Sequence, residues 1–349
     1  MFVIDSLIKQ LSPSFIHSVQ QVIDLKTKPQ GSLGVLEGLA SKVAHIQHSL
    51  SPMLKQPCLI IFAADHGIAD HGVSLFPKAV TEQMVLNFLA GGAAINCFSR
   101  QHHLELNIVN AGVCADFNII DDKFINTPIA KGTHNFLVTE AMTDIQCQQA
   151  LNRGADIVTQ KFNAGCNVIG FGEMGIANTT SAAAIMAALL NLSGKECAGR
   201  GTGVDDKGVK FKAQVIEQAI ELHQLRDATV LQILQKVGGF EIVMMVGAML
   251  KAAELSMLVL VDGFICSIAA LAASKMNDNF IDYTQFCHQS NEQAHQLVLD
   301  TLGVQPLLNL GLRLGEGSGV AVAYPLIVSA VTFFNEMASF SDAGVSESD

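Results

Sequence analysis

The sequence predicts an α/β protein with a doubly wound, mostly parallel sheet and a small helical domain formed from both chain termini. The first observation is a set of short, nearly continuous apolar runs, each followed by a helix-like stretch, as in strands buried on both faces. The second is helical spacing of apolar residues near both chain ends. The third is the length, because 349 residues are many for a single core. We expect a large α/β domain at 56–334 and a small domain at 1–55 plus about 335–349.

Five apolar runs are the expected strands. Each ends in glycine or in a polar cluster, which is typical of a strand followed by a turn. In a doubly wound sheet, ligands bind outside the carboxyl ends of the strands. The polar residues that follow these runs should therefore meet in one crevice. The runs are 58–65, 106–113, 167–175, 256–264 and 307–317.

The two ends of the chain carry helical patterns. Apolar residues recur at helical spacing in 15–25 and 33–50, and the segment between them contains a proline and a glycine that interrupt a helix. The segment 325–340 has a helical pattern as well. These three segments are the expected small domain.

Composition limits the partners. A net charge of -11 argues against nucleic acid, which requires a basic face. The most apolar segments, 242–275 and 317–334, are interrupted by charged residues, proline and many small residues, so we expect no membrane partner. The chain starts without a basic region followed by an apolar one, so we expect no export signal. Eight scattered cysteines without CxxC spacing favour reduced, mostly buried thiols and a cytoplasmic protein.

The glycine pattern GFGEMG at 170–175 matches GxGxxG. It follows an expected strand, and Glu196 lies about 20 residues on, where a dinucleotide fold places its ribose-binding acid. Two features count against this interpretation: the charge of Glu173 would face the pyrophosphate, and Glu196 does not end an apolar strand. An NAD(P)-dependent oxidoreductase and a purely structural turn both remain alternatives.

Two segments could bind a phosphate. Asn178 and its neighbours Thr179 and Thr180 are good N-cap residues before an alanine-rich helix, whose N-terminus would present free N–H groups to an anion. GRGTGVDD at 199–206 is a second glycine-rich loop, whose successive N–H groups can form an anion-binding nest, although a flexible connector is the alternative. Candidate counter-charges downstream are Lys207, Lys210 and Lys212.

Two segments contain potential metal ligands. Residues 63–72 repeat Asp-His-Gly, and 288–295 contains two histidines and a glutamate. Asp and His are also favoured turn and cap residues at a strand end. In the second segment, Ser290 with Gln293 three residues later forms a capping-box pattern that predicts a helix start. We therefore favour structural roles and expect no metal.

Glu316 is isolated between glycines in LRLGEGSGVA, residues 312–321. At the end of an expected strand and screened by an apolar crevice, its pKa would be raised by desolvation. Such a carboxylate can act as a base near neutral pH. The alternative is a charge that stabilises the N-terminus of the following helix.

Eight segments, in order from about residue 26 to about 338, then form a pattern: 26–40, 63–96, 110–113, 170–185, 199–206, 261–273, 288–295 and 312–323. Together they resemble the nicotinate-nucleotide:dimethylbenzimidazole phosphoribosyltransferase family, the CobT family of cobalamin biosynthesis. An ordered set of this kind is far more specific than one glycine motif.

The resemblance implies a homodimeric enzyme without a cofactor that transfers 5-phosphoribose, with inversion, from nicotinate mononucleotide to 5,6-dimethylbenzimidazole. The products would be α-ribazole 5'-phosphate and nicotinate. The family's general base falls on Glu316. Residues implied on the nucleotide phosphate and ribose side are Glu173, Gly175, Gly201, Gly203, Ser290 and Lys212, with Lys210 as the alternative lysine. Residues implied in the benzimidazole pocket are Gln83, Met84 and Leu314.

Overall fold

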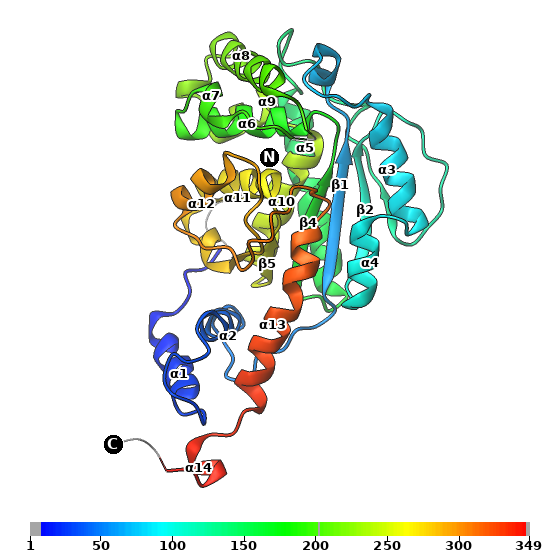
Figure 1. Ribbon diagram of the computed structural model, residues 1–349. Helices are drawn as coiled ribbons and strands as arrows, with labels where there is room; N and C mark the ends of the chain where they lie inside the picture. Colours follow the sequence, from blue (N-terminus) through cyan, green and yellow to red (C-terminus); the bar gives the residue numbers. More distant parts are fainter. Residues whose placement is uncertain (1–7, 202, 347–349) are drawn as a thin grey trace.

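The computed structural model describes residues 8–201 and 203–346. It contains a six-stranded parallel sheet in the order β3-β2-β1-β4-β5-β6, with helices on both faces (Figure 1). This confirms the predicted doubly wound α/β fold. The strand order reverses between β1 and β4, so a crevice lies at the carboxyl ends of these central strands. Parts of the predicted terminal segments, 1–7 and 347–349, lie outside the described residues, as does Thr202 of the second glycine loop.

Four of the predicted strands are confirmed. The segment 307–317 is not a strand: apart from an isolated bridge between Leu308 and His288, it is irregular. Its glycines at 311, 315 and 317 have positive φ, which interrupts the extended backbone that pairing requires. The other two strands, β3 and β6, have three residues each and give too short a pattern to predict. The strands are β1 (Cys58–Ala64), β2 (Glu105–Gly112), β3 (Phe124–Asn126), β4 (Val168–Met174), β5 (Leu258–Val261) and β6 (Thr284–Phe286).

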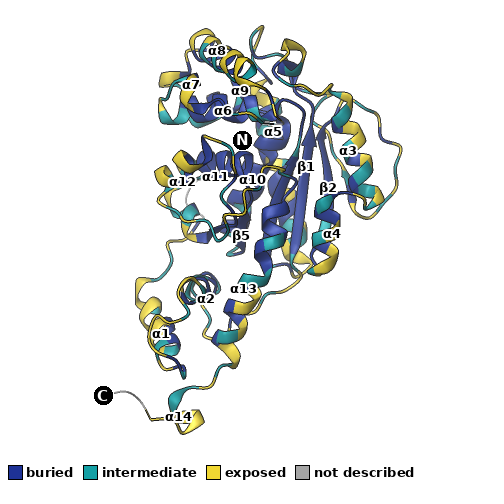
Figure 2. Cartoon of the chain, in the orientation of Figure 1, coloured by how far each residue is buried: buried dark blue, intermediate teal, exposed yellow. Residues whose placement is uncertain are grey.

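Long helices bury both faces of the sheet, as Figure 2 shows by the dark colour of the strands. Helix α10 packs against four strands and against α5 on one face, whereas α3, α4 and α13 contact the strands from the opposite face. Further helices surround the crevice. The helices of this part are α3 (Ala79–Ala90), α4 (Ala94–Gln101), α5 (Asp144–Asn163), α6 (Asn178–Leu190), α7 (Gly194–Cys197), α8 (Asp206–Leu222), α9 (Val230–Val237), α10 (Phe240–Glu254), α11 (Phe264–Met276), α12 (His295–Leu302) and α13 (Ser318–Glu336).

A second, smaller core joins the two ends of the chain. Helices α1 (Pro13–Asp24) and α2 (Val35–Ile46) confirm the two N-terminal helical patterns. Helix α2 packs against the far end of α13, and α1 packs against α2 (Figure 1). The last helix, α14 (Phe340–Ala343), follows α13. The main chains also meet, because the N–H of Thr27 donates to the carbonyl of Ala338 at 3.1 Å. The buried members of this core are Val19, Ile23, Leu39, Ala40, Ala44, Ala330 and Phe334.

Helix α13 extends from the crevice to this second core. It is the one helix in the described ranges with the length and hydropathy to cross a membrane, but more than half of its apolar window is buried inside the protein. The eight cysteines are all free, and six of them are buried, as the scattered spacing predicted.

Candidate active site

A cavity of about 220 Å³ lies at the carboxyl ends of β4 and β5. Its walls come from the end of β4, the segment before α13, the start of α11 and the segment after β6. Helix α3 adds an apolar wall. The predicted site residues that line this cavity are Met84, Glu173, Gly175, Gly201, Ser290, Leu314 and Glu316. The structure therefore brings together residues that are up to 232 positions apart in the sequence.

Glu316 lies in the tight turn that starts α13, and its side chain is buried. Its φ is +64°, a left-handed conformation that costs a non-glycine residue about 1–2 kcal/mol. Among residues 8–201 and 203–346, no group forms a hydrogen bond with its Oε2, although this oxygen is buried. A glycine at this position would avoid the strain.

The surroundings of Glu316 make it a stronger base. Burial raises the pKa of its carboxyl, the backbone N–H of Ile95 at the start of α4 opposes this effect, and the negative charge of Asp262 raises the pKa further. The side chain is therefore an acceptor with raised proton affinity, placed against an apolar cavity. This agrees with the environment predicted for Glu316, although it lies in a loop rather than at a strand end.

The first two glycines of GFGEMG, Gly170 and Gly172, lie inside β4 and have a packing role. A Cβ on Gly172 would come within 2.4 Å of the Glu316 carbonyl oxygen, and a Cβ on Gly170 within 2.5 Å of Val320 Cγ1. These glycines allow the start of α13 to lie directly on the sheet. In a dinucleotide fold the glycine turn follows the first strand, whereas this motif occupies the fourth. The oxidoreductase alternative is therefore not supported.

Glu173 is the second-last residue of β4 and faces the same loop. A Cβ on Gly315 would come within 2.3 Å of its Oε1, and the side-chain amide of Asn178 donates to its Oε2. Burial raises the pKa of Glu173 to about 8, the Asn178 amide opposes this, and the charges of Glu241, Asp262 and Glu316 add to it. At neutral pH Glu173 is mainly protonated, so it adds little negative charge beside an anionic ligand.

Helix α6 begins at Asn178 as predicted, but the expected side-chain caps are wrong. The N-cap residue is Ala177, which has no capping side chain. Asn178 instead bonds Glu173, and the Thr179 hydroxyl accepts a hydrogen bond from Lys212 Nζ at 3.0 Å. The polar side chains at this helix start therefore organise the site rather than the helix.

Lys212 and Lys210 differ in their exposure to solvent. Lys212 is buried beside Gly201, whereas Lys210 points to solvent. Burial lowers the pKa of Lys212 to about 8, and the charge of Glu292 opposes this effect. Lys212 is thus the lysine placed next to the cavity, although its Nζ is not part of the cavity wall.

The loop at 199–203 has a partner within the protein. The N–H of Gly201 donates to Glu292 Oε1 at 2.5 Å, and a Cβ on Gly199 would come within 2.5 Å of the other oxygen of this carboxylate. An anion therefore already occupies one donor of the predicted nest. Gly203 is exposed and does not line the cavity, and Gln83 on α3 is exposed outside it as well.

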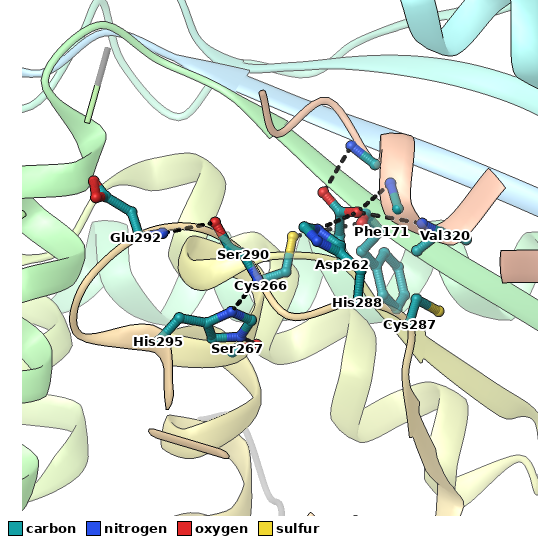
Figure 3. Close-up of polar contacts among 12 residues, drawn as sticks. Phe171, Asp262, Cys266, Ser267, Cys287, His288, Ser290, Glu292, His295 and Val320 are labelled. Carbon is teal, nitrogen blue, oxygen red and sulfur yellow. Dashed lines mark hydrogen bonds and ion pairs between the residues drawn. The ribbon is translucent and has the colours of Figure 1, made fainter. Parts of the chain in front are cut away.

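The predicted capping box at Ser290 is wrong. Helix α12 begins five residues later, at His295. The N–H of Ser290 donates to Nδ1 of His295 at 2.8 Å, and the Ser290 hydroxyl accepts from the N–H of Glu292 at 3.3 Å (Figure 3). Burial lowers the pKa of His295 to about 4, so the ring is neutral and can accept this bond. The segment is thus fixed by a histidine instead of a helix cap.

The histidines of the repeated Asp-His-Gly have protein partners. His66 Nε2 lies 2.7 Å from Glu241 Oε1 at the start of α10, and both side chains are buried. Asp65 accepts from the N–H of Cys114 at 2.8 Å, and His71 stacks on Phe211. These contacts agree with the structural roles favoured for this segment.

Sequence reasoning missed Asp262 as a residue of the site and considered His288 only as a potential metal ligand. Asp262 directly follows β5 and His288 follows β6, and both line the cavity. His288 Nε2 lies 3.4 Å from Asp262 Oδ1 in a buried pair (Figure 3). An acid immediately after an apolar strand, in VDGF, was the available signal.

Comparison with known proteins decides the family. A family model described as "Phosphoribosyltransferase" matches residues 8–345. The chain belongs to this phosphoribosyltransferase family. A nicotinate-nucleotide–dimethylbenzimidazole phosphoribosyltransferase of Dechloromonas aromatica is 52% identical over 95% of this chain and 95% of its own. The enzyme of the same name from Shewanella piezotolerans is 50% identical over 97% of this chain and 98% of its own.

A solved structure of this phosphoribosyltransferase family has the same fold. The crystal structure of CobT from Thermus thermophilus superimposes with a TM-score of 0.92 at 36% identity, covering 96% of this chain and all of the other. The resemblance predicted from the ordered motifs is thereby confirmed.

Proposed function

We propose that this protein transfers 5-phosphoribose from nicotinate mononucleotide to 5,6-dimethylbenzimidazole, giving α-ribazole 5'-phosphate and nicotinate. Relatives about half identical over nearly their whole length carry the name of this activity. The observation that carries the chemistry is the Glu316 carboxylate, a buried acceptor with a raised pKa and one oxygen without a partner among the described residues. A ligand N–H is the group that would satisfy this oxygen.

The reaction then needs one proton acceptor. One ring nitrogen of the benzimidazole attacks the anomeric carbon, the bond from that carbon to the nicotinate nitrogen breaks, and nicotinate leaves with a neutral ring. The other ring nitrogen gives its proton to Glu316, which prevents positive charge from building up on the new riboside. Attack on the face opposite nicotinate inverts the β-nucleotide to an α-riboside.

The cavity walls suit these two substrates. The apolar side chains of Phe76, Val80, Met84 and Leu314 line one part and fit a flat, uncharged base. On the other part we place the nucleotide, with Glu173, Gly175, Gly201 and Ser290 around the ribose and phosphate and Lys212 as the counter-charge. Gly203 and Gln83 lie outside this cavity. They contact the substrates only where the substrates extend beyond it.

The product assay tests this proposal. Purified protein incubated with nicotinate mononucleotide and dimethylbenzimidazole should release nicotinate and α-ribazole 5'-phosphate in equal amounts, measured by liquid chromatography. Absence of both products with folded protein would refute it.

The proposal includes a cytoplasmic homodimer. It also divides the chain into a large domain at 56–334 and a small helical domain at 1–55 plus about 335–349, which the second core of α1, α2 and α13 supports. Light scattering should give twice the chain mass of 37.2 kDa, and a monomer mass would contradict the dimer.

A further inference from the structure

The loop that carries Glu316 adopts a conformation that needs external support. Gly315, Glu316 and Gly317 all have positive φ, at 84°, 64° and 85°. Within the loop itself, the hydrogen bond from the N–H of Ser318 to the Gly315 carbonyl, at 3.0 Å, closes one tight turn. A single turn of this kind does not fix the direction of the Glu316 side chain, because the flanking glycines allow many backbone conformations.

Asp262 supplies the missing support. Its Oδ2 accepts from the N–H of Gly317 at 3.2 Å, and its Oδ1 accepts from the N–H groups of Gly319 at 2.7 Å and Val320 at 3.2 Å. The carboxylate is 1% exposed and lies against the N-terminus of α13, where the helix dipole favours negative charge. One side chain therefore satisfies three of the N–H groups that follow Glu316.

Two further contacts hold Asp262 in place. His288 Nε2 lies 3.4 Å from its Oδ1, and a Cβ on Gly319 would come within 1.9 Å of the His288 ring. Figure 3 shows Asp262 between His288 and the start of α13, with Val320 on the far side. Asp262 thus joins β5, the segment after β6 and the loop of the base in one buried contact.

We propose that Asp262 is the positioning residue for Glu316: its carboxylate fixes the glycine-flanked turn, and its negative charge keeps the Glu316 carboxyl a good proton acceptor. This inference rests on the proposed function of Glu316 as the base. It adds a residue that does not touch the reacting atoms but controls both the place and the basicity of the group that does.

The charges around Glu316 determine in which direction its pKa should change when a neighbour is removed. The other ionisable groups that line the same cavity are Glu173, Asp262, Cys266, His288, Glu292 and Arg313. Asp262 raises the pKa of Glu316, and it also raises the pKa of His288, against the lowering effect of burial. A protonated His288 offsets part of the charge of Asp262. Removing Asp262 should therefore lower the pKa of Glu316, and removing His288 should raise it.

The test compares the variants Asp262→Asn and His288→Gln with Asp156→Asn, an exposed control on α5 with the same charge change. In Asp262→Asn, kcat should fall about ten-fold or more with both KM values within about three-fold, and the acid limb of the kcat profile should move to lower pH. In His288→Gln the acid limb should move to higher pH. Asp156→Asn should match the wild type.

An acid limb of Asp262→Asn that stays in place or moves upward, while wild type and Asp156→Asn turn over normally, refutes the role of Asp262 but leaves the proposed function intact. An inactive wild type refutes the function instead.

Hydrogen exchange measured by mass spectrometry tests the positioning without activity. The peptide covering 312–324 should exchange faster in Asp262→Asn than in Asp156→Asn, with equal exchange in peptides of β1 and β2. Unchanged exchange in 312–324 refutes the positioning role, and it does so even if the assay conditions prevent turnover.

Discussion

The loop that carries Glu316 and the loop at 199–203 contribute to the same cavity but are held in opposite ways. In the first, Glu316 is buried, its main chain packs on Gly172 of β4, and the N–H groups that follow it bond to Asp262. In the second, Gly201 is held by the side chain of Glu292, Gly203 is exposed, and a Cβ on Gly203 would meet nothing within 4 Å.

This difference follows from what each loop has to do. A proton acceptor is useful only when it is within hydrogen-bond distance of the proton, so its loop must not move. A phosphate arrives from solvent with its own negative charge, so its loop must be reachable and must exchange partners. Changes near Glu316 should therefore affect kcat, and changes near 199–203 should affect the KM of the nucleotide.

The largest effect is expected for Glu316→Gln. The amide keeps the shape of the side chain but cannot accept the benzimidazole proton, so turnover should fall about 10² or more while nucleotide binding is largely retained. Steady-state kinetics and calorimetry measure the two quantities. Glu336→Gln, exposed at the far end of the same helix, is the matched control and should behave as wild type. Near-normal turnover of Glu316→Gln would mean that another residue is the general base.

The next effect is expected for Gly172→Ala. The added Cβ would meet the Glu316 carbonyl oxygen at 2.4 Å, so the loop has to shift. Overpacking of this kind costs about 1–3 kcal/mol of stability, and we expect kcat to fall about ten-fold. Gly203→Ala, on the other loop, should leave kcat within about two-fold. If both variants lowered kcat equally, the contrast between the two loops would be wrong.

Replacing Lys212 should weaken nucleotide binding. Loss of a charge-assisted hydrogen bond of about 1.5–3 kcal/mol predicts at least a ten-fold rise in the KM for nicotinate mononucleotide in Lys212→Met. Lys210→Met removes the same charge from the exposed face of α8 and should change this KM little. If Lys210→Met raised this KM more than Lys212→Met, Lys210 would be the lysine that binds the phosphate.

The pH dependence of this KM sharpens the same comparison. Because burial lowers the pKa of Lys212 to about 8, the lysine is charged below that pH and loses its charge above it. The KM for the nucleotide should be level between about pH 6 and 7 and rise above pH 8. A KM that is flat up to pH 10 would contradict a charged contact from Lys212.

The smallest effect is expected on stability, in Glu173→Gln. The folded-state pKa of Glu173, about 8, lies above its usual value of 4.5, so folding favours the protonated form. The contribution of protonated Glu173 to the stability of the folded protein is complete below pH 4.5 and is lost as the pH rises through 8. The Tm of the variant relative to wild type should therefore increase across this window, by about 2 °C or more. Parallel Tm curves in thermal scans would contradict the raised pKa.

The sequence predicted the fold because long apolar strands and helical periodicity are local signals. It failed at 307–317, where the apolar run LLNLGL matches a strand in composition but its glycines turn the backbone. The GxGxxG motif misled for a related reason. A glycine can be required by a helix packed on the sheet, and the sequence does not show that neighbour.

For the site, the sequence identified residues but not their partners. Glu316 stood out because its neighbours are glycines, whereas Asp262 did not, since its role depends on N–H groups more than fifty positions away. Ser290 was named as a site residue by the family resemblance, whereas its predicted capping box is wrong. Its partner is the ring of His295 rather than a helix N-terminus. Long-range hydrogen bonds of this kind leave no periodic trace in the sequence.

The most direct test of the central claim is a crystal structure of the protein with dimethylbenzimidazole and ribose 5-phosphate, a pair that cannot react by loss of nicotinate. We predict a carboxylate oxygen of Glu316 within about 3 Å of the ring N–H, with the other ring nitrogen facing the sugar's anomeric carbon. A Glu316 side chain turned to bulk solvent, beyond hydrogen-bond distance of the base, would contradict the account.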